Sequence, residues 1–413
     1  MNNQLAIDGG PKTKTVPFGT AMRFGEDELQ ELKEALEQNT LFYHAGQKVK
    51  TFLNNFNALY GVRYSVAASS GTAAIHIALG AAGVTVGDEV ITSPITDQGT
   101  LVGILYQNAI PVFADLEPHS YNLDPASVEA RVTPRTKAIV VVHLAGNSCD
   151  MDGIMAVARK HNLQVIEDCA QSYMTRYKGR LVGTIGHYGC FSTNDFKHIS
   201  TGDGGIVTVN SGDEAEYYAV HAFADKNYRR FGGTVIRDLN ALAPNYRMTE
   251  LQGAVGIAQL RKLPAICAAR SRYGKRLSEI IAGLPGIAVP YVAAENESSY
   301  WFYMFRINEQ QLGTTREAFC DALRAEGIPC SAGYIPDVVY MQPLFQKREA
   351  YAGSHFPFEL SDVSYERGIC PEAEAILRTA VRVEIRECFT EQDIEEMGAA
   401  IRKVASYYSQ QAR

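Results

Sequence analysis

Hydrophobic positions recur along the first sixty residues with the spacing of a helix. After an irregular segment over 1–25, this spacing predicts helices over 26–38 and 49–60. Three leucines share one face of the first helix, and three aromatic residues share one face of the second: Leu29, Leu32, Leu36, Phe52, Phe56 and Tyr60. Aromatic residues at this spacing are typical of a buried helix face, so we expect those three to pack in the core.

From residue 64 the pattern becomes an alternation of short apolar strands and helices. Strands are predicted over 64–68, 89–92, 110–115, 138–143, 163–166 and 206–210, and helices over 73–82, within 94–108 and over 151–161. This order indicates an α/β fold with a mostly parallel central sheet flanked by helices. Right-handed crossovers place the strand ends at one edge, where open α/β sheets bind ligands. Asp168 and the small-residue turn at 69–72 fall on that edge.

The last third of the chain has a different organisation. Two long helical patterns, 249–263 and 266–282, are separated by Pro264, which predicts a break between them. An aromatic-rich strand over 301–307 and helices over 316–326 and 391–408 follow. We therefore expect two units. The first is a large one over 1–265 that includes an N-terminal arm, and the second is a smaller α+β unit over 266–413.

Composition excludes several classes of protein. A chain of 413 residues exceeds one simple core, and a net charge of −7 argues against non-specific binding to nucleic acid. Apolar runs stay far below the ~20 residues of a membrane-spanning helix, so we expect no membrane association. The eight cysteines are scattered and form no CxxC pair. We expect reduced thiols, no metal site and a cytoplasmic location.

Candidate chemistry is concentrated between residues 165 and 205. Asp168 follows an apolar run, Gln171 comes three residues later, and Ser192 precedes Lys197 by five. Taken singly, these residues are most often a helix cap, a surface amide, a strand-end hydroxyl and a solvated cation. Together they form the set that pyridoxal phosphate requires: a carboxylate for the ring nitrogen, polar groups for the phenolic oxygen and phosphate, and a lysine for the Schiff base.

A second segment adds a phosphate-binding element. Gly71 and Thr72 open a predicted helix directly after a strand, and backbone N–H groups at such a helix start bind anions. This signal alone is weak, because a turn of small residues before a helix binds any phosphate or none.

The order of these motifs resembles the DegT/DnrJ/EryC1/StrS family of sugar and cyclitol aminotransferases. The matching segments are SGTA at 70–73, HLAG at 143–146, EDCAQ at 167–171, YKG at 177–179, FSTNDFK at 191–197, GDGG at 202–205 and NYRMTELQGAVGIAQLRKL at 245–263. AMRFGEDELQELKEAL at 21–36 and GIPCSAGY at 327–334 also match. The resemblance covers nearly the whole chain. It implies fold type I, the aspartate-aminotransferase fold, and pyridoxal 5′-phosphate as cofactor.

The same resemblance implies a role for each motif residue. Lys197 forms the Schiff base, Asp168 pairs with the pyridine nitrogen, Gln171 contacts the phenolic oxygen, Gly71, Thr72 and Ser192 hold the phosphate, and Asn245 reaches the phosphate of a neighbouring subunit. A homodimer with shared active sites follows from the last role.

Two positions depart from the family pattern. In SPITDQGT at 93–100, Gln98 stands where the family has an aromatic residue stacked on the cofactor ring. His198 directly follows Lys197, and related sugar 3-dehydratases carry histidine in place of the Schiff-base lysine. The spacing from Lys197 to Ser192 and to GDGG favours the aminotransferase over the dehydratase. The joint presence of Asp168, Gln171 and Lys197 argues against a non-catalytic binding or regulatory protein.

The expected reaction is a ping-pong transamination. Glutamate or glutamine donates the amino group, and pyridoxamine 5′-phosphate is the intermediate. The acceptor is a keto-sugar, expected to be nucleotide-linked, or a keto-cyclitol. Amino-sugar, antibiotic or surface-polysaccharide biosynthesis is the matching context. Candidate substrate contacts are Tyr43, His44, His198, Tyr334 and the Asp97–Gln98 turn.

Overall fold

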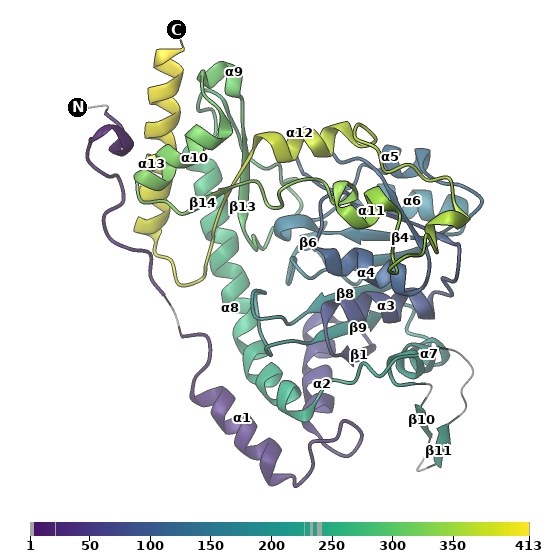
Figure 1. Ribbon diagram of the computed structural model, residues 1–413. Helices are drawn as coiled ribbons and strands as arrows, with labels where there is room; N and C mark the ends of the chain where they lie inside the picture. The colour runs from purple at the N-terminus through teal and green to yellow at the C-terminus, as the bar shows by residue number, and fades with distance from the viewer. Residues whose placement is uncertain (1–3, 21, 227, 232–233, 238–241, 413) are drawn as a thin grey trace.

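The computed structural model describes residues 4–20, 22–226, 228–231, 234–237 and 242–412. Its centre is a seven-stranded sheet in the order β1-β9-β8-β5-β4-β2-β3 (Figure 1). The strands are β1 (Tyr64–Ala68), β2 (Glu89–Thr92), β3 (Ile110–Phe113), β4 (Thr136–Val142), β5 (Gln164–Asp168), β8 (Tyr188–Ser192) and β9 (Gly205–Val209). Only β9 runs against its neighbours in this sheet, so the predicted mostly parallel α/β architecture is confirmed.

Strand register brings the candidate residues to one edge. Gly205, the first residue of β9, pairs with both Ala68 at the end of β1 and Ser192 at the end of β8. Asp168, the last residue of β5, pairs with Cys190 of β8. Three strand ends and one strand start therefore meet where the sequence predicts a ligand site.

Helices cover both faces of this sheet. On one face lie α3 (Gly71–Ala81) and α7 (Glu214–Ala224), and on the other lie α2 (Lys48–Tyr60), α6 (Met151–His161) and part of α8 (Glu250–Ile281). Helices α4 (Gln98–Tyr106) and α5 (Pro125–Ala130) complete this unit. Two small hairpins, β6 (Arg176–Tyr177) with β7 (Arg180–Leu181) and β10 (Tyr228–Phe231) with β11 (Thr234–Arg237), extend from it. The aromatic face predicted for 49–60 is buried, with Phe52 and Phe56 fully enclosed.

Helix α1 (Glu26–Glu37) shows the apolar stripe but does not bury it. Leu29 and Leu36 are 58% and 62% exposed, whereas Glu28 and Glu31 are buried. The reason is charge pairing, because lysines of α2 and α8 hold those acids: Glu28 to Lys262 at 2.6 Å and Glu31 to Lys48 at 2.7 Å. The leucine stripe therefore lies on the outer surface of this chain.

The predicted break at Pro264 is wrong, because α8 continues through it for 32 residues. Its first half packs on α1 and α2, and its second half is tied to α13 (Glu391–Gln411) by ion pairs of Arg272 and Arg276 with Glu391 and Glu395. Packing along both halves keeps the helix continuous despite the missing proline N–H. The expected boundary at 265/266 falls inside this helix, which spans both units (Figure 1).

The smaller unit is built on a four-stranded antiparallel sheet in the order β12-β13-β15-β14. Its elements are β12 (Ile287–Ala288), β13 (Tyr303–Ile307), α9 (Glu309–Leu312), α10 (Arg316–Ala325), β14 (Cys330–Ala332), α11 (Pro343–Lys347), α12 (Pro371–Thr379), β15 (Ala380–Val383) and α13. Thr390 and Asp393 form the predicted capping box at the start of α13. An α+β character for this unit follows.

The N-terminal segment lies beside the smaller unit before it crosses to α1 (Figure 1). Leu5 is fully buried in that unit's core, and Lys14 forms a buried ion pair with Asp393 at 2.7 Å. Among the helices of the described residues, none combines the length and the apolar character needed to cross a membrane.

Candidate active site

Helix α3 begins directly against the end of β8. A Cβ atom at Gly71 would lie only 2.6 Å from Ser192 Cβ, so this close approach requires glycine. Ser70 caps the helix by accepting the Ala73 N–H at 3.0 Å, and helix geometry leaves the N–H groups of Gly71 and Thr72 without an intrahelical acceptor. The predicted phosphate ligands thus converge as a group of backbone donors and one hydroxyl.

Asp168 lies at the adjacent strand end and is buried. Thr100 Oγ1 donates a hydrogen bond of 2.8 Å to one carboxylate oxygen, and the Ala170 N–H donates one of 3.1 Å to the other. Burial raises the pKa of Asp168, and these donors together with the charge of Lys197 offset part of that rise. The carboxylate is held in place, but a buried cationic partner would stabilise its charged form further.

Lys197 follows β8 on a turn that fixes its backbone at both ends. Its N–H donates to Asn194 O at 2.9 Å, and its carbonyl accepts from Arg23 Nη2 at 2.6 Å. Its ammonium lies 4.1 Å from the ring centroid of Trp301. Burial lowers the pKa of Lys197, while the charges of Asp168 and Asp97 oppose that shift. A lysine in this state loses its proton more readily than a surface lysine, which makes the amine nucleophilic.

Gln171 and Tyr334 connect the two units beside Asp168. Gln171 accepts the Ala145 N–H through Oε1 at 2.9 Å and donates through Nε2 to the Tyr334 hydroxyl at 3.2 Å. Tyr334 stacks on Phe302 with centroids 4.9 Å apart. The predicted substrate contact Tyr334 is therefore brought next to a predicted cofactor contact.

Gln98 is the first residue of α4 and is exposed. A Cβ atom at the next residue, Gly99, would meet Thr72 Oγ1 at 2.5 Å, so the starts of α3 and α4 lie side by side. Asp97 caps α4 and lines the cleft together with Lys197. Gln98 therefore lies next to the candidate phosphate group.

A cleft of about 870 Å³ opens between the two units at Lys197. The larger unit contributes Asp97 and residues 194–197, and the smaller unit contributes Trp301, Arg382 near the end of β15 and residues 384–388 after that strand. The cleft has the size of ordinary small-molecule sites, so the lysine amine is accessible to a substrate.

Two predicted residues lie together in a different place. Asn245 is exposed and forms a β-bridge with Asp225, and Tyr43 packs edge-on against His44. His44 Nε2 lies 2.6 Å from Asp225 Oδ2. Their partners Asp225 and His221 are not members of the Asp168–Lys197 group of the same chain.

His198 is turned away from the cleft. It is fully buried, its Nε2 lies 3.3 Å from Ser299 O, and its ring packs against Tyr173. Burial lowers the pKa of His198 well below its usual range, and Arg270 adds to the shift. This placement opposes the expectation that His198 contacts substrate, because the side chain would have to leave the core to do so.

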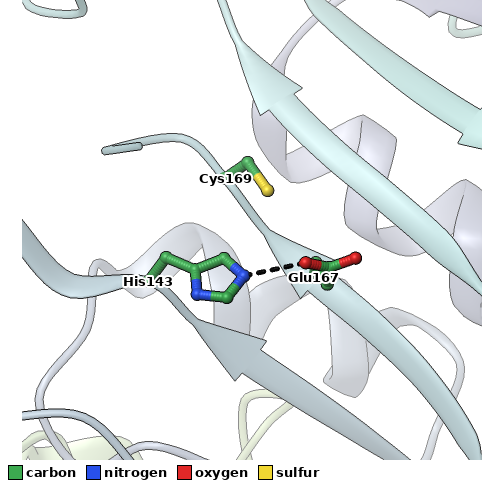
Figure 2. A group of neighbouring side chains, drawn as sticks. All are labelled: His143, Glu167 and Cys169. Carbon is green, nitrogen blue, oxygen red and sulfur yellow. Dashed lines mark hydrogen bonds and ion pairs between the residues drawn. The ribbon is translucent and has the colours of Figure 1, made fainter. Parts of the chain in front are cut away.

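A buried cluster behind the site joins His143, Glu167 and Cys169, whose polar atoms all lie within 4.8 Å of one another (Figure 2). His143 Nδ1 accepts the Cys149 N–H, so Nε2 carries the proton and donates it to Glu167 at 3.0 Å. Glu167 also accepts N–H groups from the 183–186 turn. These hydrogen bonds use both ring nitrogens of His143 and both carboxylate oxygens of Glu167, so these two side chains join β4, β5 and the 183–186 turn.

Three neighbours of the site were not identified from the sequence. Thr100 gives no local signal, because only the packing of α4 on β5 brings it to Asp168. Trp301 is the chain's single tryptophan, which marks it without placing it. Arg382 lies in VRVEIRE at 381–387, where apolar and charged residues alternate. That alternation indicates a strand with one charged face, which could have identified a cleft wall.

Comparison with known proteins places this geometry among sugar-modifying enzymes. A family model described as the DegT/DnrJ/EryC1/StrS aminotransferase family matches residues 23–402. The chain is 37% identical over 310 residues to GDP-perosamine synthase of Caulobacter vibrioides, covering 75% of this chain and 81% of that protein. It is 30% identical over 433 residues to L-glutamine:2-deoxy-scyllo-inosose aminotransferase of Streptoalloteichus tenebrarius, covering 99% of each.

A solved structure shares the fold. The X-ray structure of the aminotransferase from Psychrobacter cryohalolentis superimposes with a TM-score of 0.84 at 30% sequence identity, covering 95% of this chain and all of that one.

Proposed function

We propose that this chain, which belongs to the DegT/DnrJ/EryC1/StrS aminotransferase family, aminates a keto-sugar or keto-cyclitol. It is a pyridoxal-phosphate-dependent aminotransferase, and the proposed amino donor is glutamine or glutamate. The observation that carries the proposal is Lys197, which is buried beside Asp168 and yet lines the cleft between the units. Amino-sugar, antibiotic or surface-polysaccharide biosynthesis is the corresponding context.

The residues at the sheet edge fit pyridoxal 5′-phosphate. Gly71 leaves room beside Ser192 that a Cβ atom would fill, and the donors there suit a phosphate dianion. Asp168 suits a protonated pyridine nitrogen, because a buried carboxylate with a raised pKa gains most from a cationic partner. Gln171 would contact the phenolic oxygen, and Gln98 would cover a ring face. The bound cofactor supplies an electron sink for the carbon that carries the amino group.

The protein's own groups then perform the proton transfers. Lys197 would hold the cofactor, and its amine, with a pKa lowered by burial, would serve as the base for the Cα proton of the donor. Asp168 would hold a negative charge opposite the ring nitrogen of the bound cofactor. The same lysine would return a proton when the keto acceptor becomes the amine.

The position of His198 argues against the sugar 3-dehydratase. The sugar 3-dehydratases carry a histidine in place of the Schiff-base lysine. In this chain His198 is buried in the core, whereas Lys197 lines the cleft. The one-residue slip that would exchange their roles is opposed by the geometry.

A homodimer with shared sites is part of the proposal. Asn245 and Tyr43 lie apart from their own chain's Lys197, as expected if they serve a partner's site. The exposed leucine stripe on α1 supplies apolar surface for such contact. We also keep a cytoplasmic location in the proposal, which the eight free cysteines support.

The acceptor is proposed from the relatives' names. One relative is named for a GDP-linked amino sugar and another for a cyclitol ketone with L-glutamine as donor. The match to the second spans nearly the whole of both chains, which favours glutamine as the donor tested first.

The holoenzyme should lose the visible absorbance band of its lysine-bound cofactor on addition of L-glutamine or L-glutamate, with release of the matching 2-oxo acid. Lys197→Ala should abolish this conversion, whereas Lys178→Ala, an exposed lysine paired with Asp152, should convert at the wild-type rate. A Lys197→Ala protein that turns over normally, or a wild-type protein that converts neither donor, would refute the proposal.

A further inference from the structure

A second groove, of about 750 Å³, lies between the two units and apart from the cleft at Lys197. The larger unit contributes residues 118, 119 and 121 from the loop after β3, and the smaller unit contributes residues 283–289, 306–309, 311, 378 and 379. The groove shares no lining residue with the cleft. Its volume is that of ordinary small-molecule sites, so it has room for a ligand that the proposed reaction does not use.

Tyr121 is the most deeply buried polar side chain of this groove. It is only 3% exposed, yet its hydroxyl has no hydrogen-bond partner in the part of the chain that the structure describes. Burial raises the pKa of Tyr121, and the charge of Arg306 opposes that rise, so the hydroxyl lies near this guanidinium. Buried polar groups ordinarily have partners, and a hydroxyl left without one marks a place where a ligand supplies it.

Arg306 presents a fixed guanidinium to the same groove. Its Nε donates to Thr379 Oγ1 at 2.8 Å, and its Nη1 donates to Pro118 O at 3.0 Å and to Glu372 Oε1 at 2.7 Å. These contacts hold the planar group in place and leave Nη2 without a partner among the described residues. The side chain therefore needs little further ordering when its remaining N–H groups bind an anion.

Two exposed side chains of the groove add further donors. Arg378 and His119 line it, and neither side chain has a partner within the described ranges. The lining residues include one carboxylate, that of Glu309, which accepts the Arg316 N–H at 2.7 Å. The unpaired side chains of the groove are therefore chiefly donors, and two of them are arginines, which suits an anion.

We propose that this groove binds a small molecule through a phosphate group. Its four unpaired donor side chains, two of them arginines, exceed what the two oxygens of a carboxylate accept in one bidentate pair. A phosphate monoester offers three acceptor oxygens and binds arginine forks equally well. The apolar residues at 284–287 would contact the rest of the molecule. This site goes beyond the proposed transamination and does not depend on it.

Calorimetry of the holoenzyme tests the site, because the bound cofactor already occupies the phosphate cradle at Gly71 and Ser192. Wild type should bind glucose 6-phosphate and should not bind glucose. Arg378→Gln should bind glucose 6-phosphate about 10-fold more weakly, and Tyr121→Phe about 3-fold more weakly, the losses expected for a charged and a neutral hydrogen bond. Arg386→Gln, which removes an arginine of the cleft instead, is the matched control and should bind as wild type does.

Thermal unfolding gives an independent measure. Tyr121→Phe removes a hydroxyl that has no partner in the described chain, so without ligand it should unfold at a temperature no lower than wild type. A ligand that binds only the folded state stabilises it in proportion to the logarithm of its affinity. Glucose 6-phosphate should therefore raise the unfolding temperature of wild type more than that of Arg378→Gln or Tyr121→Phe.

Three results would overturn the proposal. The first is a wild-type holoenzyme that binds neither inorganic phosphate nor glucose 6-phosphate. The second is unchanged binding in both groove variants, and the third is an equal loss in Arg386→Gln, which would place the ligand in the cleft. A ligand-free Tyr121→Phe protein that unfolds at a lower temperature would show that the hydroxyl serves the fold rather than a ligand. Because no measurement involves turnover, these outcomes leave the proposed transamination untouched.

Discussion

Burial shifts the pKa values of Asp168 and Lys197 in opposite directions. Burial disfavours the charged form of both, so it raises the pKa of the carboxyl and lowers that of the ammonium. The attraction between the two charges offsets only part of each pKa shift, because the pKa of Asp168 stays raised and that of Lys197 stays lowered. A site of this kind is stabilised by a ligand that brings a cation to the carboxylate and takes up the amine. The apo-protein accordingly carries a cost that the cofactor relieves.

That cost predicts a pH-dependent stability of the apo-protein. The folded-state pKa of Asp168 is raised above the ordinary value of about 3.9. Asp168 therefore lowers the stability of the fold progressively as pH rises from about 3.9 to that raised value. Asp168→Asn stays neutral, so the cofactor-free variant should unfold at a higher temperature than wild type at pH 7 and at the same temperature below about pH 3.9.

Thermal unfolding followed by circular dichroism across this range measures the difference. Asp362→Asn, an exposed carboxylate, is the control and should track wild type at every pH. A variant that is no more stable at pH 7 than below pH 3.9, relative to wild type, would contradict the account of burial. The same Asp168→Asn protein should be inactive, since its amide cannot hold a charge opposite the ring nitrogen.

At the scale of elements, periodicity predicts helices and strands well but says nothing about which face is covered. The bounds of the six strands predicted for the sheet agree with the observed ones to within a few residues, whereas β8 was not among the predicted strands. Helix α1 shows the limit of periodicity as a guide to burial. The ion pairs of Glu28 and Glu31 bury the acidic face of the helix, so Leu29 and Leu36 are exposed. Pro264 shows another, because tertiary packing on both halves of α8 overrides a local breaker.

One carboxylate joins the starts of two helices. Glu250, the first residue of α8, is fully buried and accepts the Lys48 and Val49 N–H groups at the start of α2, at 2.7 and 3.1 Å. A negative charge is favoured at both helix N-termini by their dipoles. Gly46 allows this approach, because a Cβ atom there would lie 2.1 Å from the Glu250 carboxylate.

Removing this tie should destabilise the fold. Glu250→Ala leaves two buried N–H groups unpaired and should lower the free energy of unfolding by about 2–4 kcal/mol. Glu37→Ala, which removes an exposed acid 3.9 Å from Lys33, should cost less than about 0.5 kcal/mol. Urea unfolding of the two variants compares them directly. Equal losses would show that burial of Glu250 adds nothing.

At the scale of the molecule, the sequence could predict only the part of the site that lies at the edge of the large sheet. Asp168 and Ser192 lie at strand ends and Gly71 opens the helix that follows β1, so topology brings them together and the motifs mark them. Arg382 and Trp301 reach the cleft from the other unit, and no local pattern fixes how the two units meet. The roles proposed for Tyr43 and Asn245 would depend on a second subunit, which a single chain's pattern cannot place.

The exposed leucines of α1 give the strongest prediction at this scale. Charged residues at two apolar positions of a dimer interface remove their burial and add desolvation, so Leu29→Glu combined with Leu36→Glu should weaken the homodimer at least about 100-fold. If Asn245 and Tyr43 complete the partner's site, the monomer should also bind the cofactor weakly and lose transaminase activity.

Sedimentation velocity at micromolar protein, with activity measured on the same samples, tests both statements. Val86→Glu is the matched control: Val86 is 51% exposed, close to the 58% and 62% of the two leucines, but lies between α3 and β2. It should remain dimeric and active. A fully active monomer would show that each chain carries a complete site, and a double variant that remains a normal dimer would place the interface elsewhere. Because Val86→Glu also places a charge at an exposed apolar position, a loss seen only in the α1 variant would point to the surface of α1.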